Sequence, residues 1–164
     1  MTAIAESNRA VIKLKEKFPS SVQEVKEFRG EVTVTVSKEH IVDICRFLKT
    51  DLNYNLLTDV TSVDYMGRDP RFMVVYNLYS IPNKDRLRVK AAVSEAAPEI
   101  DSVCCVWNSA NWLERETFDL FGIAFVGHPD LRRILMTDDW VGHPLRKDYP
   151  LQGPGREPYK ARLS

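Results

Sequence analysis

The sequence is poor in cysteine, with three in 164 residues. Cys104 and Cys105 are adjacent and point to opposite sides of any strand, and Cys45 falls on the apolar face of a predicted helix. An iron–sulfur cluster needs a set of closely spaced thiolates, which this pattern lacks. The cysteines therefore predict reduced thiols that pack as small apolar side chains, rather than a cluster or a disulfide framework.

Long apolar runs and an excess of charge are also missing. No stretch approaches the roughly 20 apolar residues that span a bilayer, and the first ten residues lack the basic-then-apolar order of a secretory signal. Lysine plus arginine equal aspartate plus glutamate at 23 each, so nothing general attracts the chain to nucleic acid or acidic lipid. We expect a cytoplasmic protein that does not insert into a membrane.

The remaining composition, 44% hydrophobic and 28% charged, is that of an ordinary globular domain with a sizeable core. Hydrophobic periodicity predicts the order α-β-β-α-β-β-β. This order favours a two-layer α+β fold in which helices cover one face of a mainly antiparallel sheet. The predicted helices span 7–18 and 37–48, and the predicted strands span 22–28, 32–36, 54–65, 72–80 and 86–93, with a further short strand at 102–107.

A third helix is predicted to begin at Asn111, which can cap it with Glu114 as the partner in a capping box. Gly122 is the natural stop. Helical spacing predicts that one face carries Leu113, Thr117, Leu120 and Phe121. The opposite face is predicted to be charged, with Arg115 and Asp119 spaced as an i,i+4 pair, and it carries Trp112, Arg115, Glu116 and Asp119.

After this helix the chain repeats itself, with GHPDLRR at 127–133 echoed by GHPLRKD at 142–148. In each copy the proline favours an extended histidine, and the arginine offers a planar fork of donors. The prolines and glycines forbid a long helix or a central strand, yet the segment is too apolar for a disordered tail. We therefore expect an α+β domain of residues 1–126 and an extended arm, residues 127–164, that folds against another chain.

The run ERETFDLFG at 114–122, followed by GHPDLRRIL and GHPLRKDYPL, resembles the 30 kDa-type subunit family of NADH:quinone oxidoreductase, which is respiratory complex I (NDH-1). The sequence LTDVTSVDY at 57–65 is similar to the upstream strand of that family. The likeness covers most of the chain from about residue 41 onward.

This resemblance implies a non-catalytic subunit that binds no cofactor of its own. The implied complex passes electrons from NADH through FMN and iron–sulfur clusters to quinone and translocates protons. The implied partners are the quinone-site large subunit and the subunit that holds the terminal cluster, with the ferredoxin-like subunit as a further candidate. The implied location is peripheral, on the cytoplasmic side of the inner cell membrane. The equivalent role in a related membrane-bound hydrogenase or another quinone-reducing complex stays open.

We expect the charged helix face and the two histidine–proline repeats to meet carboxylates or carbonyls of these partners. The predicted interface residues are Glu114, Arg115, Glu116, Asp119, His128, Arg132, Arg133, His143, Arg146, Lys147 and Asp148.

Two other classes of function have weaker support. A zinc hydrolase would use the histidines with nearby aspartates, but no pair has HxxxH or HExxH spacing. Glu114, Glu116 and Asp119 could form an acid/base set, although carboxylates on one helix beside Arg115 are more often ion-pair partners. A nucleic-acid module would use the basic face of the strand at 86–93, but such domains are typically basic overall. No GxGxxG or P-loop pattern is present.

Overall fold

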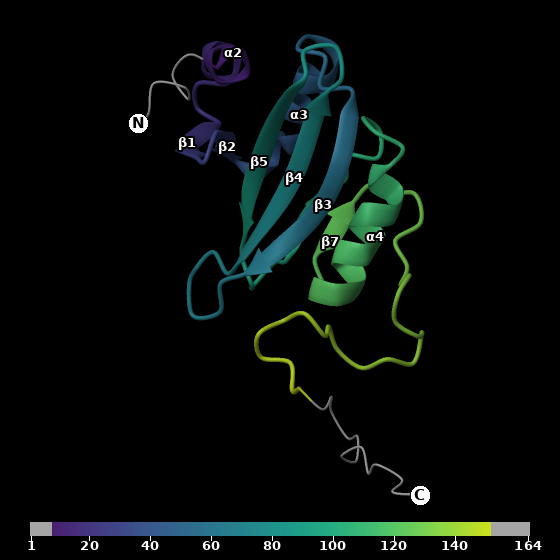
Figure 1. Cartoon of the computed structure of the whole chain (residues 1–164). Helices are drawn as coiled ribbons and strands as arrows, with labels where there is room; N and C mark the ends of the chain where they lie inside the picture. The colour runs from purple at the N-terminus through teal and green to yellow at the C-terminus, as the bar shows by residue number, and fades with distance from the viewer. Residues whose placement is uncertain (1–7, 152–164) are drawn as a thin grey trace, which may run out of the picture.

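The computed structural model describes residues 8–151. A five-stranded sheet with the order β1-β2-β5-β4-β3 forms one layer (Figure 1). The pair β2–β5 is parallel and the other neighbours are antiparallel, which confirms the predicted mainly antiparallel sheet. The strands are β1 (Val22–Phe28), β2 (Glu31–Val36), β3 (Leu56–Asp64), β4 (Phe72–Ser80) and β5 (Asp85–Val93).

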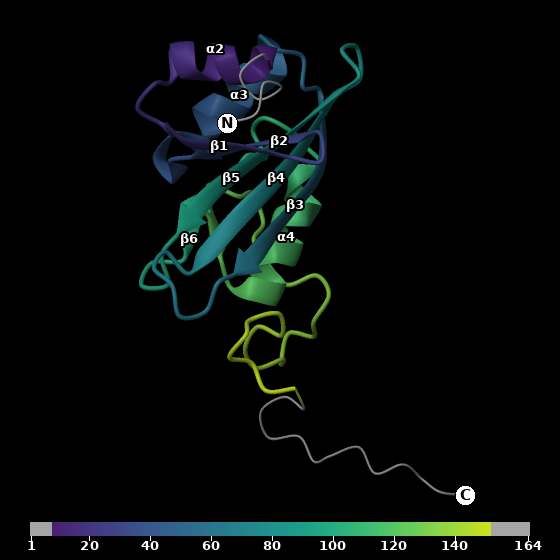
Figure 2. The ribbon, with the colours of Figure 1, turned by 60° about the vertical axis from the view of Figure 1, so that its left-hand side comes forward.

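Three helices pack on one face of this sheet: α2 (Arg9–Lys17), α3 (Ile41–Thr50), which follows the 3-10 turn η1 (Lys38–His40), and α4 (Ala110–Phe121). Figure 1 looks onto the other face, with α3 behind the strands and α4 beside β3. Figure 2 shows α2 and α3 together near β1 and β2, away from α4. The predicted two-layer α+β fold is confirmed.

The alternation in β2 shows why the sheet forms. Val32, Val34 and Val36 are at most 4% exposed, whereas Thr33 and Thr35 on the other face are half-buried. Side chains of a strand alternate between its faces, so the period-two pattern places every valine in the core beneath the helices. Burial alternates in the same way along β4 and β5. The other face of the sheet has no covering helix in the described chain.

The predicted strand at 102–107 is wrong. The short strands there are β6 (Glu99–Asp101) and β7 (Ala124–Val126), which pair in parallel, and the chain from 102 to 107 forms turns instead. The physical reason lies in α4. The amide of Val103 and the hydroxyl of Ser102 both donate to the Glu114 carboxylate, which draws this segment out of an extended line.

The start of α3 also differs from the prediction. Ser37 makes no capping hydrogen bond to the helix, because its hydroxyl donates to the carboxylate of Glu39 instead. The chain therefore enters through a 3-10 turn before regular α-helix begins at Ile41.

Residues 127–151 contain no regular helix or strand, as the prolines predicted. They do not extend away from the domain, however. They run along α4 and then under the lower ends of β3 and β4 (Figures 1 and 2).

Within the described part of the chain, no helix has the length and apolar character that crossing a bilayer requires.

Candidate functional site

Helix α4 is covered on two sides. Its sheet side carries Thr117, whose hydroxyl donates to the carbonyl of Val60 in β3 at 3.1 Å. On another side Arg115 and Asp119 are 7% and 0% exposed, beneath the arm. This second side was predicted to be a charged face that meets partner subunits, but Arg115 and Asp119 on it are covered by the arm of the same chain. Arg115 and Asp119 do not pair with each other, because each is bonded to the arm.

Asp119 is the anchor of the arm. One carboxylate oxygen accepts from the amides of Ile134, Leu135 and Met136 at 3.0, 2.8 and 2.8 Å. The other oxygen accepts from Nη1 of Arg133 at 2.7 Å. Burial alone would raise the pKa of Asp119, but these donors outweigh it and hold the pKa below its ordinary value. Asp119 is therefore an ionised carboxylate enclosed by the arm.

Arg115 holds the arm one turn earlier on the helix. Its guanidinium donates to the carbonyls of Arg132 and Arg133, each at 3.2 Å, and lies against the ring of Trp112. The contacts made by Arg115 and Asp119 are therefore mostly to backbone groups of the arm, which fixes the path of the chain there rather than only one side chain.

The C-terminal end of α4 is capped by the second histidine–proline repeat. The last four carbonyls of a helix have no partner within it, and here the carbonyls of residues 118–121 all find donors. In helix order the donors are the amide of Gly122 at 2.8 Å, Nδ1 of His143 at 2.9 Å, the amide of Leu145 at 3.0 Å and Nε of Arg146 at 2.6 Å.

Gly122 makes this cap possible, and it ends the helix as predicted. Its φ of +72° is left-handed, a conformation that side chains strain. A Cβ at this position would lie 2.5 Å from the ring of His143 and 2.7 Å from Nη2 of Arg146. Only a glycine lets the repeat approach the helix end so closely.

The two repeats hold opposite ends of α4. His128 in the first copy donates from Nε2 to the carbonyl of Asn111 at 3.1 Å and accepts from the amide of Asp130 at Nδ1. His143 in the second copy donates to the carbonyl of Asp119, and its burial lowers its pKa, which favours the neutral ring. The repeated sequence is therefore a repeated carbonyl clamp on one helix.

A buried arginine locks the end of the arm to the sheet. Arg71, 3% exposed at the start of β4, donates to both oxygens of Asp64 at 2.8 Å and to both oxygens of Asp148 at 2.8 and 3.1 Å. It also pairs with Glu95 at 2.6 Å, and the amide of Lys147 donates to Asp64 at 2.8 Å. Hydrogen bonds from Arg71 lower the pKa of both Asp64 and Asp148.

Arg71 and Asp64 were not predicted from the sequence as site residues. One sequence signal pointed to them. Asp64 follows Val60 and Ser62 at alternating positions of β3, so its side chain is expected on the same buried face of the strand. A carboxylate at such a position needs hydrogen-bond donors or a cation, and the chain offers Arg71 across the turn.

Glu114 is the other buried carboxylate of α4, at 0% exposure. It accepts from the amide of Val103 at 2.8 Å, the hydroxyl of Ser102 at 2.6 Å and the thiol of Cys104 at 3.4 Å. No lysine or arginine of the described chain pairs with it, and burial raises its pKa. The predicted capping box with Asn111 is wrong, because the helix already begins at Ala110 and Glu114 faces the loop after β6.

Cys104, Glu114 and His128 place their sulfur, oxygen and nitrogen ligand atoms within 4.8 Å of one another. This donor set is one that a divalent metal such as zinc accepts. Each group is already engaged, however: the thiol donates to Glu114, and both ring nitrogens of His128 have partners. Hydrogen bonds therefore account for the arrangement. The zinc set considered from sequence is not assembled either, because His128 and His143 lie at opposite ends of α4.

We predict that Glu114→Gln changes how stability depends on pH. Because the folded pKa of Glu114 is raised, its contribution is fully present below the unfolded pKa and is lost as the pH rises toward the folded value. Glutamine does not titrate, so the free energy of unfolding of the variant, relative to that of the native chain, should increase as the pH rises above the unfolded pKa of a glutamate. Urea denaturation at several pH values measures this, with exposed Glu116→Gln as the control. Parallel curves for the native chain and the Glu114 variant would contradict it.

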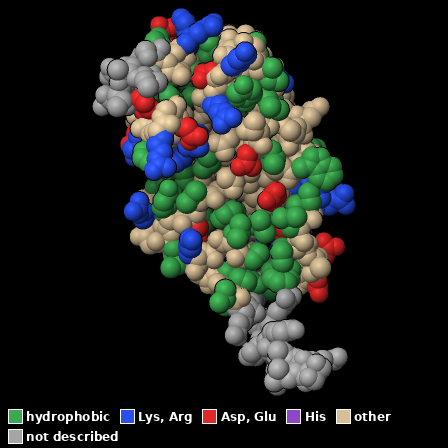
Figure 3. All heavy atoms as spheres, in the orientation of Figure 1, with side chains coloured by type: hydrophobic (Ala, Val, Ile, Leu, Met, Phe, Trp, Pro, Cys, Tyr) green, Lys and Arg blue, Asp and Glu red, His purple; other side chains and the backbone are tan. Residues whose placement is uncertain are grey.

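The outward side of the arm carries several exposed apolar side chains among charged ones. Leu135, Val141 and Leu145 are 59%, 68% and 50% exposed, and Trp112 on α4 is 61% exposed. Figure 3 shows apolar side chains gathered over the lower half of one face of the molecule, whereas charged side chains are more frequent in the upper half.

The predicted interface residues thus fall into two groups. Most are used inside the chain: Glu114, Arg115, Asp119, His128, Arg133, His143, Arg146 and Asp148. Three have exposed side chains beside the apolar surface of the arm: Glu116, Arg132 and Lys147.

Comparison with known proteins agrees with this architecture. The sequence pattern of the family described as "Respiratory-chain NADH dehydrogenase, 30 Kd subunit" matches residues 34–155. The chain belongs to this family. The C subunit of NADH-quinone oxidoreductase from Geotalea uraniireducens is 75% identical over 100% of both chains. Its counterpart from Geobacter metallireducens is 76% identical over 98% of this chain and 100% of the relative. The chain is therefore a subunit of the NADH-quinone oxidoreductase type.

Two solved structures share the fold of this member of the 30 kDa subunit family. A trypsin-resistant fragment (1–134) of Nqo5 is 33% identical with a TM-score of 0.66, and the match covers 74% of this chain and 99% of the fragment. A chain of a membrane-bound sulfane sulfur reductase, described as an archaeal respiratory membrane complex, is 25% identical with a TM-score of 0.75. That match covers 86% of this chain and 84% of the other.

Proposed function

We propose that this 30 kDa-family subunit is a structural, cofactor-free component that binds its neighbours through the outward side of the arm. In this proposal the complex carries electrons from NADH through FMN and iron–sulfur clusters to quinone. The chain supports assembly around the quinone-site large subunit and the terminal-cluster subunit. It lies peripherally on the cytoplasmic side of the membrane.

The observation that carries the proposal is the two-sided character of the arm. Its inner side is fixed by Asp119, Arg115 and the carbonyls of α4, while Leu135, Val141 and Leu145 remain exposed. Several large apolar side chains exposed on one segment are a feature of interaction sites. An arm already ordered on its own helix loses less conformational entropy when a partner binds, which favours assembly.

The packing of the arm on α4 differs from what the sequence predicted. The sequence predicted an arm that folds against another chain. Residues 128–148 instead contact α4, Asp64 and Arg71 of their own domain. We retain the partner-binding role for the outward side alone, with Arg132, Lys147 and Glu116 as the charged rim.

The use of the ionisable groups supports a structural role for the subunit itself. Asp119, His143 and Arg146 are bonded to backbone groups, and Glu114 is enclosed by the loop at 102–104. Each holds two segments of this chain together, which is what a scaffold requires.

The proposed function is tested by placing a charge on the apolar side of the arm. Leu135→Glu and Leu145→Glu should each reduce the amount of assembled complex at least tenfold, because a buried unpaired charge opposes association. The melting temperature of the isolated subunit should change little, since both side chains are exposed. Ile12→Glu is the matched control, because Ile12 is 41% exposed and lies on α2, away from α4 and the arm (Figure 2). Normal assembly of the two leucine variants would contradict the proposal.

A second candidate is the equivalent subunit of another respiratory complex. The similarity to a chain of the sulfane sulfur reductase complex favours it, because the fold occurs there too. The two candidates differ in the electron donor. NADH-driven quinone reduction by the purified complex that contains this subunit supports the first, and its absence in a fully assembled complex supports the second.

A further inference from the structure

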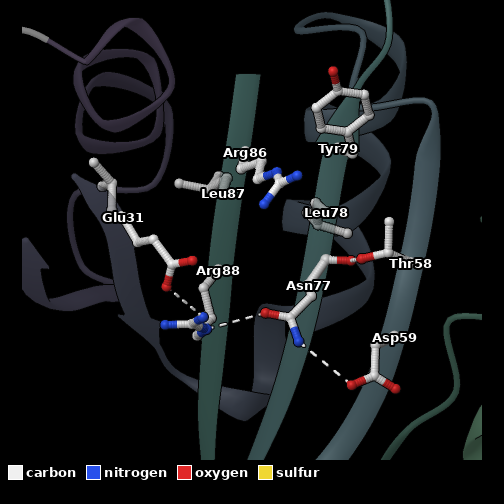
Figure 4. A pocket seen from close by; sticks show the side chains of 10 residues that line it. Glu31, Thr58, Asp59, Asn77, Leu78, Tyr79, Arg86, Leu87 and Arg88 are labelled. Carbon is white, nitrogen blue, oxygen red and sulfur yellow. Dashed lines mark hydrogen bonds and ion pairs between the residues drawn. The ribbon is translucent and has the colours of Figure 1, made fainter. Parts of the chain in front are cut away.

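The face of the sheet that no described helix covers contains a groove, and none of residues 127–151 of the arm line it. The groove has a volume of about 440 Å³ and lies across β2, β3, β4 and β5 (Figure 4). Its polar lining includes Glu31, Asp59, Asn77, Tyr79, Arg86 and Arg88. This is the basic face that the alternation of the 86–93 strand indicated, and no described residue of the arm lies in its lining.

The charges in the groove are only partly paired. Arg88 forms an ion pair with Glu31 at 2.7 Å and donates to Asn77 at 3.0 Å, so this pair is neutral. Arg86 has no carboxylate partner among the described residues and lies over the ring of Tyr79, 5.8 Å from its centroid. Figure 4 shows its guanidinium reaching toward β4 without a bonded partner among the residues drawn.

Asp59 is an anion of the groove that lacks a cationic partner, as Arg86 is a cation that lacks an anionic one. Its carboxylate is approached by the amide of Asn77 at 3.5 Å, and no lysine or arginine of residues 8–151 pairs with it. The groove is therefore neutral overall, with one unpaired cation on β5 and one unpaired anion on β3. A polyanion such as nucleic acid would gain at Arg86 but would be repelled at Asp59.

The strand register sets the spacing of the two charges. Arg86 lies opposite Tyr79, and Asp59 lies opposite Asn77, two residues away on β4. Two residues along a strand and two strand spacings across correspond to on the order of 12 Å. On the same face, toward the far end of the strands, the next rows carry Thr61, Val75 and Lys90 and then the apolar Val63, Met73 and Ala92.

We propose that this groove is a second docking surface, which takes a segment of another subunit that carries both signs of charge. An acidic residue of that segment pairs with Arg86 above Tyr79, and a basic residue roughly 12 Å away pairs with Asp59. Apolar side chains of the same segment lie on Val63, Met73 and Ala92. The inference rests on the proposed role as a subunit of a complex, but it concerns a different face from the arm.

Photo-crosslinking of the assembled complex tests the groove. p-Benzoylphenylalanine in place of Thr58, which lines the groove, should crosslink to one segment of a neighbouring subunit that contains an acidic and a basic residue. Arg86→Glu and Asp59→Lys should each lower the crosslink yield per assembled complex at least fivefold. Arg68→Glu is the matched control, because Arg68 is also exposed and lies over a tyrosine ring, that of Tyr65.

The outcomes separate this inference from the proposed function. The same photoreactive residue in place of Leu135 reports on the arm, so a crosslink from Thr58 without one from Leu135 supports the groove and contradicts the arm. The melting temperature of each isolated variant shows whether that variant folds. If a variant does not fold, the presence or absence of the Thr58 crosslink in the otherwise native chain decides whether the groove is a docking surface. A complex that assembles normally without a Thr58 crosslink would overturn the inference. So would a crosslink that Arg86→Glu and Asp59→Lys both leave unchanged.

Discussion

Replacing Asp119 with alanine should lower the free energy of unfolding of the isolated chain by about 3–5 kcal/mol, because it leaves buried partners of a charged group unmatched. Arg133, whose side chain is 19% exposed, loses its ion pair, and the amides of Ile134, Leu135 and Met136 lose their acceptor. The arm should then become accessible to trypsin in the free subunit. Urea denaturation and limited proteolysis measure the two effects.

Two controls make this result specific. Glu116→Ala, on the exposed side of the same helix, should change the free energy of unfolding by less than about 0.5 kcal/mol.

The pKa of Asp119 is lowered in the fold, so its contribution to stability is present above the unfolded pKa and is lost as the pH falls through the folded pKa. Asp119→Asn, which cannot ionise, should lack this loss at acidic pH. An alanine variant as stable as the native chain, with a protected arm, would show that Asp119 does not hold the arm.

The second large effect is expected at Arg71. Arg71→Ala should destabilise the isolated chain by about 3–5 kcal/mol, because Asp64 would remain as a buried carboxylate without its cation. Arg71→Lys keeps the charge but cannot donate to Asp64 and Asp148 through a planar fork, so it should restore only part of the stability. Thermal and urea denaturation measure these losses.

Arg68→Ala is the control for Arg71, since it removes an exposed arginine from the same β3–β4 turn. Only Arg71→Ala should also increase hydrogen exchange around Lys147, whose amide donates to Asp64. Equal stability of the two alanine variants would mean that the cluster of Arg71, Asp64 and Asp148 contributes nothing to the fold.

The sheet could be predicted from sequence because its signals are local. The alternation of valine and threonine in β2 and the turn at Arg29 and Gly30 each depend on neighbouring residues. The ends of β1 and β4 were predicted to the residue, and Gly122 was identified as the end of α4. The family was visible for the same reason, since its motifs are continuous in the chain.

The packing of the arm could not be predicted, because it depends on distant pairs. Nothing near Asp119 in sequence indicates that its acceptor oxygens meet amides fifteen to seventeen residues later. Helical periodicity assigned Arg115 and Asp119 to a charged face, but it only separates polar from apolar residues and does not show which segment covers a polar face. Proline and glycine correctly excluded regular structure in residues 127–151, but they do not determine what an irregular segment packs against.

Hydrogen exchange of three amides in the isolated full-length subunit tests the central claim most directly. If the arm is ordered by its own domain, the amides of Ile134, Leu135 and Met136 should exchange at least a hundredfold more slowly than in an unstructured chain, because each donates to buried Asp119. The same amides in Asp119→Ala should lose that protection, while those of β4 keep theirs. Exchange of the three amides at the unstructured rate in the native subunit would contradict the claim and would make the arm dependent on a partner for its order.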